Sequence, residues 1–213
     1  QLPNLLNRIG NRSIVLTLGV ILKKQNVNRK LKNMANNRHN VFVSYHHGND
    51  QKYRDDFEKL FSDIYDIFVC KSVQIGDIPD NTSTDRIRQI IRDEYLRDTT
   101  VTVVLIGSET WKRKHVDWEI GSSIRETSLN SRSGLIGIIL PTYPRTDITK
   151  YNPYTIPPRL NDNLKCNFAK IYNWTTNQNE VQNGIHEAFE RRNKINPDNS
   201  FPNFVNNRTT DKW

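Results

Sequence analysis

Residues 100–106 read TVTVVLI, and no other run in the chain is as typical of a β-strand. Threonine, valine and isoleucine are β-branched and favour the extended backbone of a sheet. The run lacks the polar alternation of a half-exposed strand, which indicates a central strand covered on both faces. A sheet with helices on both of its faces is therefore the first expectation for this chain.

Shorter apolar runs and helical patterns alternate on either side of this strand. Further strands are expected at 40–44 (NVFVS), 66–70 (DIFVC), 135–140 (LIGIIL) and, more weakly, 168–172. Helices are expected at 50–65, from 82 to 96, at 116–128 and at 181–191. Strands joined by helix-length crossovers form parallel sheets. The predicted fold class is therefore α/β, a doubly wound parallel sheet of about five strands.

The net charge of +8 lies in the N-terminal part of the chain. Residues 1–40 hold eight Lys or Arg and no acid, which leaves 23 basic and 23 acidic residues in 41–213. The neutral body argues against a nucleic-acid partner. We accordingly divide the chain into a basic N-terminal extension (1–39), a domain (40–192) and a polar, Asn-rich tail (193–213) that we expect to be loosely ordered.

The N-terminal extension has more than one interpretation. Its apolar run Ser13–Leu22 is typical of an extra helix or strand packed on the domain, and an export signal is a weaker alternative because no cleavage site follows. The true start of the protein at Met34 is the other interpretation. No run approaches the 18 apolar residues of a membrane span. The two cysteines fit a reducing cytosol, so a cytoplasmic protein without membrane contact is expected.

Ligands of doubly wound sheets bind beyond the carboxyl ends of the strands. The loops at 44–49, 71–83 and 107–115 are therefore the expected location of a site. Neither GxGxxG nor GxxxxGK[ST] occurs there, which argues against a dinucleotide-dependent dehydrogenase and a P-loop NTPase. His46 and His47 are adjacent and would point opposite ways on extended chain, so no metal site is expected.

Glu119 is the candidate for chemistry. It lies three residues after Val116 and next to Ile120, at the border of the buried face of the helix that follows the central strand. A carboxylate flanked there by Trp118, with aromatic residues upstream, would lie in a partly desolvated cleft, where carboxylates act as catalysts. The alternative is a solvated glutamate that is favoured by the helix dipole.

Three stretches of the chain resemble a known family: residues 41–45 (VFVSY), 99–110 (TTVTVVLIGSET) and 116–124 (VDWEIGSSI). They are similar to the TIR domain, and most similar to the TIR-like ThsB proteins of the bacterial anti-phage system Thoeris. The likeness runs from about residue 40 to 140, with the loop and helix before Glu119 as its most specific part. The resemblance implies a flavodoxin-like TIR fold.

The resemblance also implies an enzyme that cleaves the nicotinamide–ribose bond of NAD+, its substrate, without a further cofactor, and releases an ADP-ribose-derived, cyclic signal. Glu119 takes the place of the family's catalytic glutamate. The substrate-binding residues that the resemblance implies are Phe42, Ser44, Tyr45, Ser83, Asp85, Trp111 and His115. Phe42 is equally typical of a core residue. His115 stands where the family usually has tryptophan, so imidazole or Trp111 would take over any stacking on the substrate.

The chemistry suits a single carboxylate. Glycoside hydrolases generally need a second one to protonate the leaving oxygen, but nicotinamide leaves NAD+ as a neutral molecule. The expected partners are NAD+, an effector reached through the nucleotide product, a phage-derived activator and further copies of the chain. The alternative function is a non-catalytic TIR-like adaptor, and a third is an enzyme that stays dormant until assembly completes its site.

Overall fold

The computed structural model describes residues 38–72, 83–128 and 130–213. The Ser13–Leu22 run and Met34 lie outside the described residues, as does residue 82, where we expected a helix to begin. Residues 39–213 form one compact unit. No helix within the described ranges has the length and apolar character needed to span a bilayer.

Five parallel strands form a single sheet in the order β2-β1-β3-β4-β5. The strands are β1 (His39–Ser44), β2 (Phe68–Lys71), β3 (Val101–Ile106), β4 (Gly134–Ile139) and β5 (Ala169–Asn173). The predicted α/β, flavodoxin-like fold is therefore confirmed. The chain adds β2 on one side of β1 and β3 on the other, so the strand order reverses between β1 and β3, and a crevice at such a switch point is where ligands of these sheets bind.

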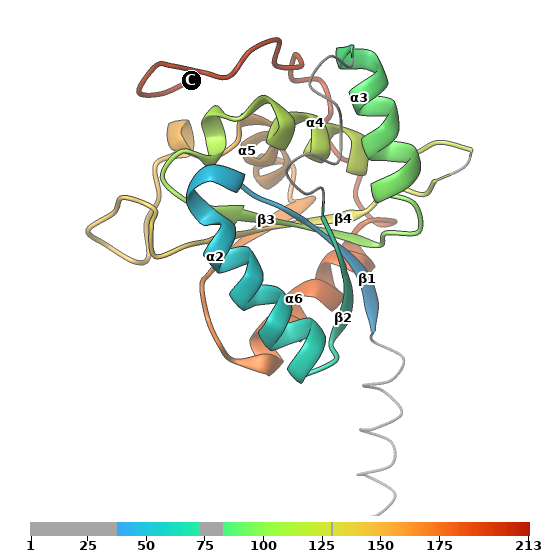
Figure 1. Cartoon of the computed structure of the whole chain (residues 1–213), viewed down its shortest axis with the longest axis vertical. Helices are drawn as coiled ribbons and strands as arrows, with labels where there is room; N and C mark the ends of the chain where they lie inside the picture. The colour runs from blue at the N-terminus through green and yellow to red at the C-terminus, as the bar shows by residue number, and fades with distance from the viewer. Residues whose placement is uncertain (1–37, 73–82, 129) are drawn as a thin grey trace, which may run out of the picture. The chain divides into compact units, whose positions relative to one another are not determined.

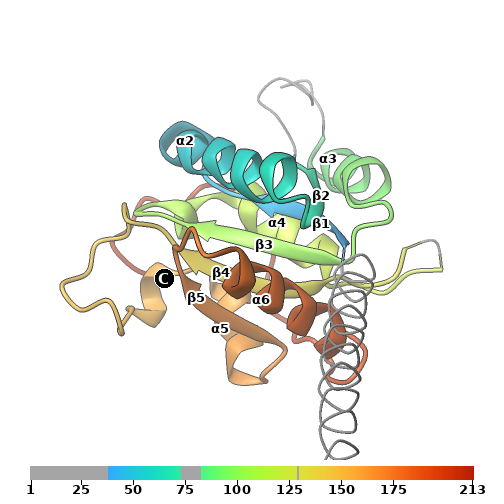
Figure 2. The same ribbon diagram turned by 90° about the horizontal axis from the view of Figure 1, so that it is seen from below.

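Helices cover both faces of the sheet, as Figure 1 shows. They are α2 (His47–Glu58), α3 (Thr84–Ile90), α4 (Lys114–Ser123), α5 (Pro158–Lys165) and α6 (Gln178–Arg191). Figure 2 views the sheet from the face that α2 and α6 cover, whereas α3, α4 and α5 lie on the other face. Both α2 and α3 continue as short π-helical segments, Lys59–Ile64 and Ile91–Tyr95.

The core lies on both sides of β3, whose residues are all buried. On one side, Val101, Val103 and Leu105 pack with the apolar faces of α2 and α6. On the other side, Val104 and Ile106 pack with α4 and α5. Because both faces of the central strand are covered, its sequence needs no polar alternation.

Two of our predictions differ from the structure near α4 and α5. We expected the helix after β3 to run to Ser128, but α4 ends at Ser123, whose carbonyl accepts a hydrogen bond from the Ser133 amide where the chain turns back towards β4. Helix α5 was not predicted at all. It begins at Pro158, and proline is common at the first position of a helix. Leu160 and Leu164 are the two leucines that form its apolar side.

The expectation of a loosely ordered tail is wrong for the segment beside α4. Phe204 is 6% exposed, its amide donates to Asp117 Oδ2 at 2.9 Å, and its carbonyl accepts from Trp118 Nε1 at 2.8 Å. The amide of Arg208 donates to the Lys112 carbonyl. The asparagine-rich composition predicted an irregular backbone, and the segment has one. It is nevertheless ordered, because side chains from α4 form hydrogen bonds with its backbone.

Candidate active site

Glu119 and Ser44 meet at the switch point of the sheet. Ser44 is the last residue of β1, and Glu119 lies in the second turn of α4, the helix that follows β3. The Ser44 hydroxyl donates a hydrogen bond to Glu119 Oε2 at 2.5 Å. The two residues are 75 positions apart in sequence, so the fold brings together a pair that the sequence proposed only separately.

Burial dominates the electrostatics of Glu119. Its side chain is 2% exposed, and desolvation raises its pKa to about 8, although the Ser44 hydrogen bond acts in the opposite direction. Desolvation disfavours the charged form of a carboxyl group, and a donor to the carboxylate favours it. Glu119 is therefore mostly protonated at neutral pH, and a cation placed beside it would release the proton.

Aromatic and imidazole rings line the same edge of the sheet. The Tyr45 ring lies 4.4 Å from that of His47, which in turn lies 5.7 Å from that of His115, measured between centroids. Burial, followed by the charges of neighbouring histidines, lowers the pKa of His115 to about 4. His115 is thus a neutral ring at pH 7, which is the form that stacks on or accepts hydrogen bonds from a ligand.

His46 belongs to this edge as well, although the sequence suggested an ordinary loop residue. It is 8% exposed, and its Nδ1 is buried without a hydrogen-bond partner among the residues that the structure describes. Burial and the charge of Arg113 lower its pKa to about 4. Within the described ranges, no group of three or more His, Cys, Asp or Glu side chains could hold a metal ion.

Three of the residues proposed to bind substrate are core residues in the structure. Phe42 is fully buried and packs with Ile91 and Leu96, the role that the sequence left open for it. Tyr45 is 1% exposed, and its hydroxyl donates to Gln51 Oε1 at 2.7 Å. Trp111 is 2% exposed, in a short 3₁₀ turn before α4. Of the proposed residues whose side chains the structure describes, Ser44 is the one with a hydrogen bond to Glu119.

The remaining two proposed residues lie at the start of α3. Ser83 is the N-cap residue of this helix and is exposed, without a side-chain hydrogen bond to the helix amides. Asp85 lies in the first turn, but its side chain is outside the described part of the structure. The structure thus places both at the helix start.

Trp118 does not flank Glu119 in the way we expected. Its indole N–H donates to the carbonyl of Phe204, so its polar edge faces the C-terminal segment. Successive residues of a helix point about 100° apart, which separates neighbouring side chains.

Sequence reasoning missed a buried acid that ties the loops of this edge together. Asp50, at the start of α2, is fully buried and accepts hydrogen bonds from the hydroxyls of Thr110, after β3, and Thr142, after β4. Gly107 faces it so closely that a Cβ there would lie 2.3 Å from both carboxylate oxygens. Glycine at 107, directly after the central strand, is a sequence feature that could have indicated such a close approach.

A five-stranded parallel sheet with covered faces and a buried glutamate at its switch point defines a flavodoxin-like α/β domain. Residues 42–145 match the family model described as Thoeris protein ThsB, TIR-like domain. This part of the chain is therefore a ThsB TIR-like domain, as the resemblance predicted. The match covers β1 from Phe42 through β4 and ends before α5. No match is found among curated proteins.

Proposed function

We propose that this protein is a cytoplasmic NAD+-cleaving enzyme of anti-phage defence, which breaks the nicotinamide–ribose bond with Glu119. The observation that carries the proposal is the buried carboxyl group of Glu119 beside Ser44, at the switch point of a TIR-like domain. A titratable group with a strongly shifted pKa at a ligand-binding edge is a candidate for catalysis on physical grounds.

The reaction requires little beyond stabilisation of positive charge. When the glycosidic C–N bond breaks, its electron pair moves to the nicotinamide nitrogen, and the pyridinium becomes neutral nicotinamide. Positive charge then develops on the anomeric carbon and ring oxygen of the ribose. A carboxylate at Glu119 would hold the ribose hydroxyls and stabilise that charge, as preorganised groups do in transition states.

The protonation state of Glu119 fits a site that is completed by a cationic substrate. With a pKa of about 8, the group is mostly neutral at pH 7. The pyridinium of NAD+ beside it would favour the carboxylate, because an opposite charge within about 4–6 Å lowers the pKa of an acid. Ser44 stabilises the same ionised form through its hydrogen bond to Oε2.

The nucleophile decides the product. If water adds to the anomeric carbon, the water loses one proton and the product is ADP-ribose. If a hydroxyl or ring nitrogen of the same nucleotide adds instead, the product is cyclic, and we propose this outcome because the resemblance implies a diffusible signal for a separate effector. A phage-derived activator and self-assembly are the proposed controls on the reaction.

The second candidate function is a TIR-like module that assembles with partners and performs no catalysis. One observation favours it: the Glu119 side chain is only 2% exposed, so in this conformation little of the carboxyl group is accessible. His115, in place of the family's usual tryptophan, favours the same reading. The adaptor and the enzyme differ in whether NAD+ is consumed.

The deciding experiment is mass spectrometry of small molecules after incubation of the protein with NAD+, with and without lysate from phage-infected cells. We expect loss of NAD+ and formation of an ADP-ribose species, and the product mass separates hydrolysis from cyclisation. Glu119→Gln should lower the rate about a hundredfold or more, the scale of losing one transition-state charge partner. Glu126→Gln, at an exposed glutamate, is the matched control and should leave the rate unchanged.

Ser44→Ala tests Glu119 through the pH profile of NAD+ cleavage, which would not shift if Glu119 had only a structural role. Without the hydroxyl, the pKa of Glu119 should rise further, so the pH profile of NAD+ cleavage should shift towards alkaline pH. Unchanged cleavage by a folded Glu119→Gln protein would refute the assignment of Glu119. Intact NAD+ in every sample, activator included, would leave the adaptor as the function.

A further inference from the structure

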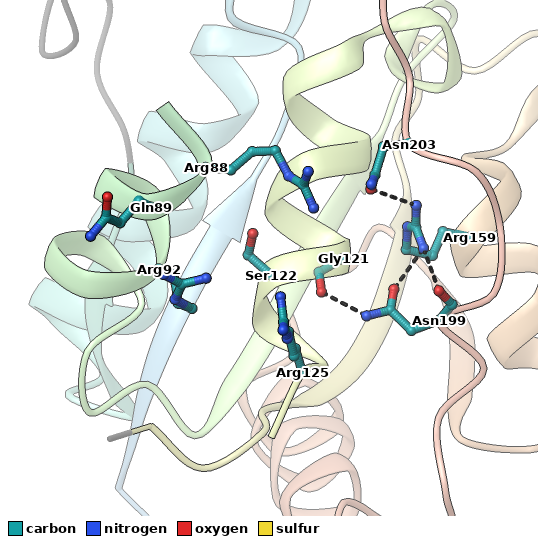
Figure 3. Close-up of a pocket in the computed structure, with 9 residues that line it drawn as sticks. All are labelled: Arg88, Gln89, Arg92, Gly121, Ser122, Arg125, Arg159, Asn199 and Asn203. Atoms are coloured by element: carbon teal, nitrogen blue, oxygen red, sulfur yellow. Dashed lines mark hydrogen bonds between the residues drawn. The ribbon is translucent and has the colours of Figure 1, made fainter. Parts of the chain in front are cut away.

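A pocket lies on the side of α4 that faces α3 and the C-terminal segment. Its volume is about 490 Å³, within the range of small-molecule sites. Figure 3 shows guanidinium groups converging on it from three directions. Arg88 and Arg92 come from α3 and its π-helical extension, Arg125 follows α4, and Arg159 lies on α5. Neither Glu119 nor Ser44 is among the residues that line it.

The lining is strongly cationic. It contains these four arginines and no aspartate or glutamate. Asp117 pairs with Arg159, and Asp93 pairs with Arg92. Among the described residues, no ion pair neutralises Arg125, which is exposed at the rim. Net positive charge therefore remains in a concave site, where field lines concentrate and attract anions.

Arg159 is held in place before any ligand arrives. It is 1% exposed, and its guanidinium donates to Asp117, to Asn199 Oδ1 at 2.6 Å and to Asn203 Oδ1 at 3.2 Å. Gly121 makes room for it, since a Cβ there would lie 3.1 Å from Arg159 Nε. A buried arginine with this many partners keeps its orientation, and its N–H groups are already engaged by protein acceptors. Arg159 therefore shapes the wall of the pocket and adds positive charge, while Arg88, Arg92 and Arg125 are the guanidinium groups that would contact a ligand.

We propose that this pocket binds a small molecule with adjacent phosphate groups, of the nucleoside diphosphate class. Several guanidinium groups around one cavity match the negative charge that is spread over the two phosphate groups of a diphosphate. A ligand with a single carboxylate would not engage all of them. The volume exceeds what inorganic phosphate alone would fill, which leaves room for a nucleoside. The asparagine side chains of Asn199 and Asn203 add polar groups to the wall formed by the C-terminal segment.

The site is independent of the proposed catalytic group, although the two share a helix. Glu119 contacts Ser44 of β1, whereas Gly121 and Arg125, further along, line the pocket. Because Asn199 of the C-terminal segment bonds both Arg159 and the carbonyl of Gly121, a bound ligand would brace that segment against α4. Ligand binding should thus stabilise the fold by mass action.

Isothermal titration calorimetry of the full chain with ADP, pyrophosphate and adenosine tests the proposal. We expect ADP to bind, pyrophosphate to bind more weakly and adenosine not to bind. Arg125→Ala and Arg88→Ala should each weaken ADP binding about tenfold or more, because each removes a charge-assisted contact. Arg97→Ala removes the same charge from an exposed position outside the pocket and is the matched control.

Glu119→Gln separates this site from the catalytic one, and it should bind ADP as the unchanged chain does. Three results would overturn the proposal: no heat with millimolar ADP, equal weakening by all three arginine variants, or loss of ADP binding in Glu119→Gln. The second would indicate non-specific attraction, and the third would place the nucleotide at Glu119. Because binding is measured directly, the result does not depend on whether the protein consumes NAD+.

Discussion

Replacing Glu119 with glutamine should stabilise the fold, and more strongly as the pH rises. The pKa of Glu119 is 4.5 in its ordinary state and about 8 in the folded protein, where desolvation raises it. Between these values the unfolded chain has lost the proton that the folded chain still holds. Stability therefore falls as pH rises from about 4.5 to about 8, and the loss is complete above both values.

The size of the effect follows from the same two values. Each unit of pKa difference corresponds to 1.36 kcal/mol, so the interval amounts to about 5 kcal/mol above pH 8. Glutamine has nearly the same shape, carries no charge, and its Oε1 accepts the hydrogen bond from Ser44 in the same way. The stability difference between Glu119→Gln and the unchanged chain should be constant below about pH 4 and should grow to about 5 kcal/mol by pH 9.

Urea unfolding followed by tryptophan fluorescence at pH 4, 5, 7 and 9 measures this difference. Groups other than residue 119 titrate equally in both proteins, so their contributions cancel in the comparison. Glu126→Gln, which changes an exposed glutamate, should show no such growth. A stability difference that stays the same from pH 4 to pH 9 would refute the claim that burial keeps Glu119 protonated.

Three further changes test the contacts around the site. Gly107→Ala places a Cβ 2.3 Å from the Asp50 carboxylate, and urea unfolding should show a loss of about 1–3 kcal/mol, as for other overpacked cores. Arg159→Met leaves Asp117 buried without its ion pair and should lose about 3–5 kcal/mol, with faster proteolysis of the C-terminal segment. Burial, followed by a neighbouring histidine's charge, lowers the pKa of His39 to about 4. The unchanged chain should therefore lose up to about 3 kcal/mol as pH falls from 6.5 to 4, and His39→Gln should not.

Matched controls distinguish these effects from general damage. Gly48→Ala is the control for Gly107, because a Cβ at Gly48 meets nothing closer than 3.4 Å; equal stability of the two alanine variants would contradict the close contact at Asp50. An Arg159→Met protein with an unchanged urea midpoint would contradict the role of the buried ion pair. For His39, the opposing result is an acid loss that is identical in the variant.

The strands were predictable because their information is local. Residues 100–106 and 135–140 are apolar runs whose length and β-branched content are enough to indicate buried strands, and the structure has β3 and β4 there within one residue at each end. Helix α5 was not predictable in this way, because its eight residues include only two leucines and, apart from Pro158, its remaining side chains are polar or charged. Its helical state depends on packing Leu160 against a sheet that forms elsewhere in the chain.

The candidate site divides along the same line. The position of Glu119 after the central strand follows from its spacing in the sequence, and the end of β1 at Ser44 follows from the apolar run before it. Their hydrogen bond, and the protonation that burial imposes on Glu119, require contacts across 75 positions of chain. The arginine pocket requires even more distant partners, since α3, α4, α5 and the C-terminal segment each contribute to it.

The order of residues alone thus indicated the fold class and the edge of the sheet at which ligands of such folds bind, because periodicity and spacing act over a few neighbouring residues. It also placed Glu119 at that edge as a candidate acid, whose catalytic role the family resemblance implies. It misjudged the C-terminal segment, whose irregular backbone is held by Asp117, Trp118 and Arg159. Desolvation, ion pairing and cavity shape are properties of surroundings assembled from distant parts of the chain. The pKa of Glu119, the Asp117–Arg159 ion pair and the arginine pocket are therefore set only when the chain has folded and water has left the interior.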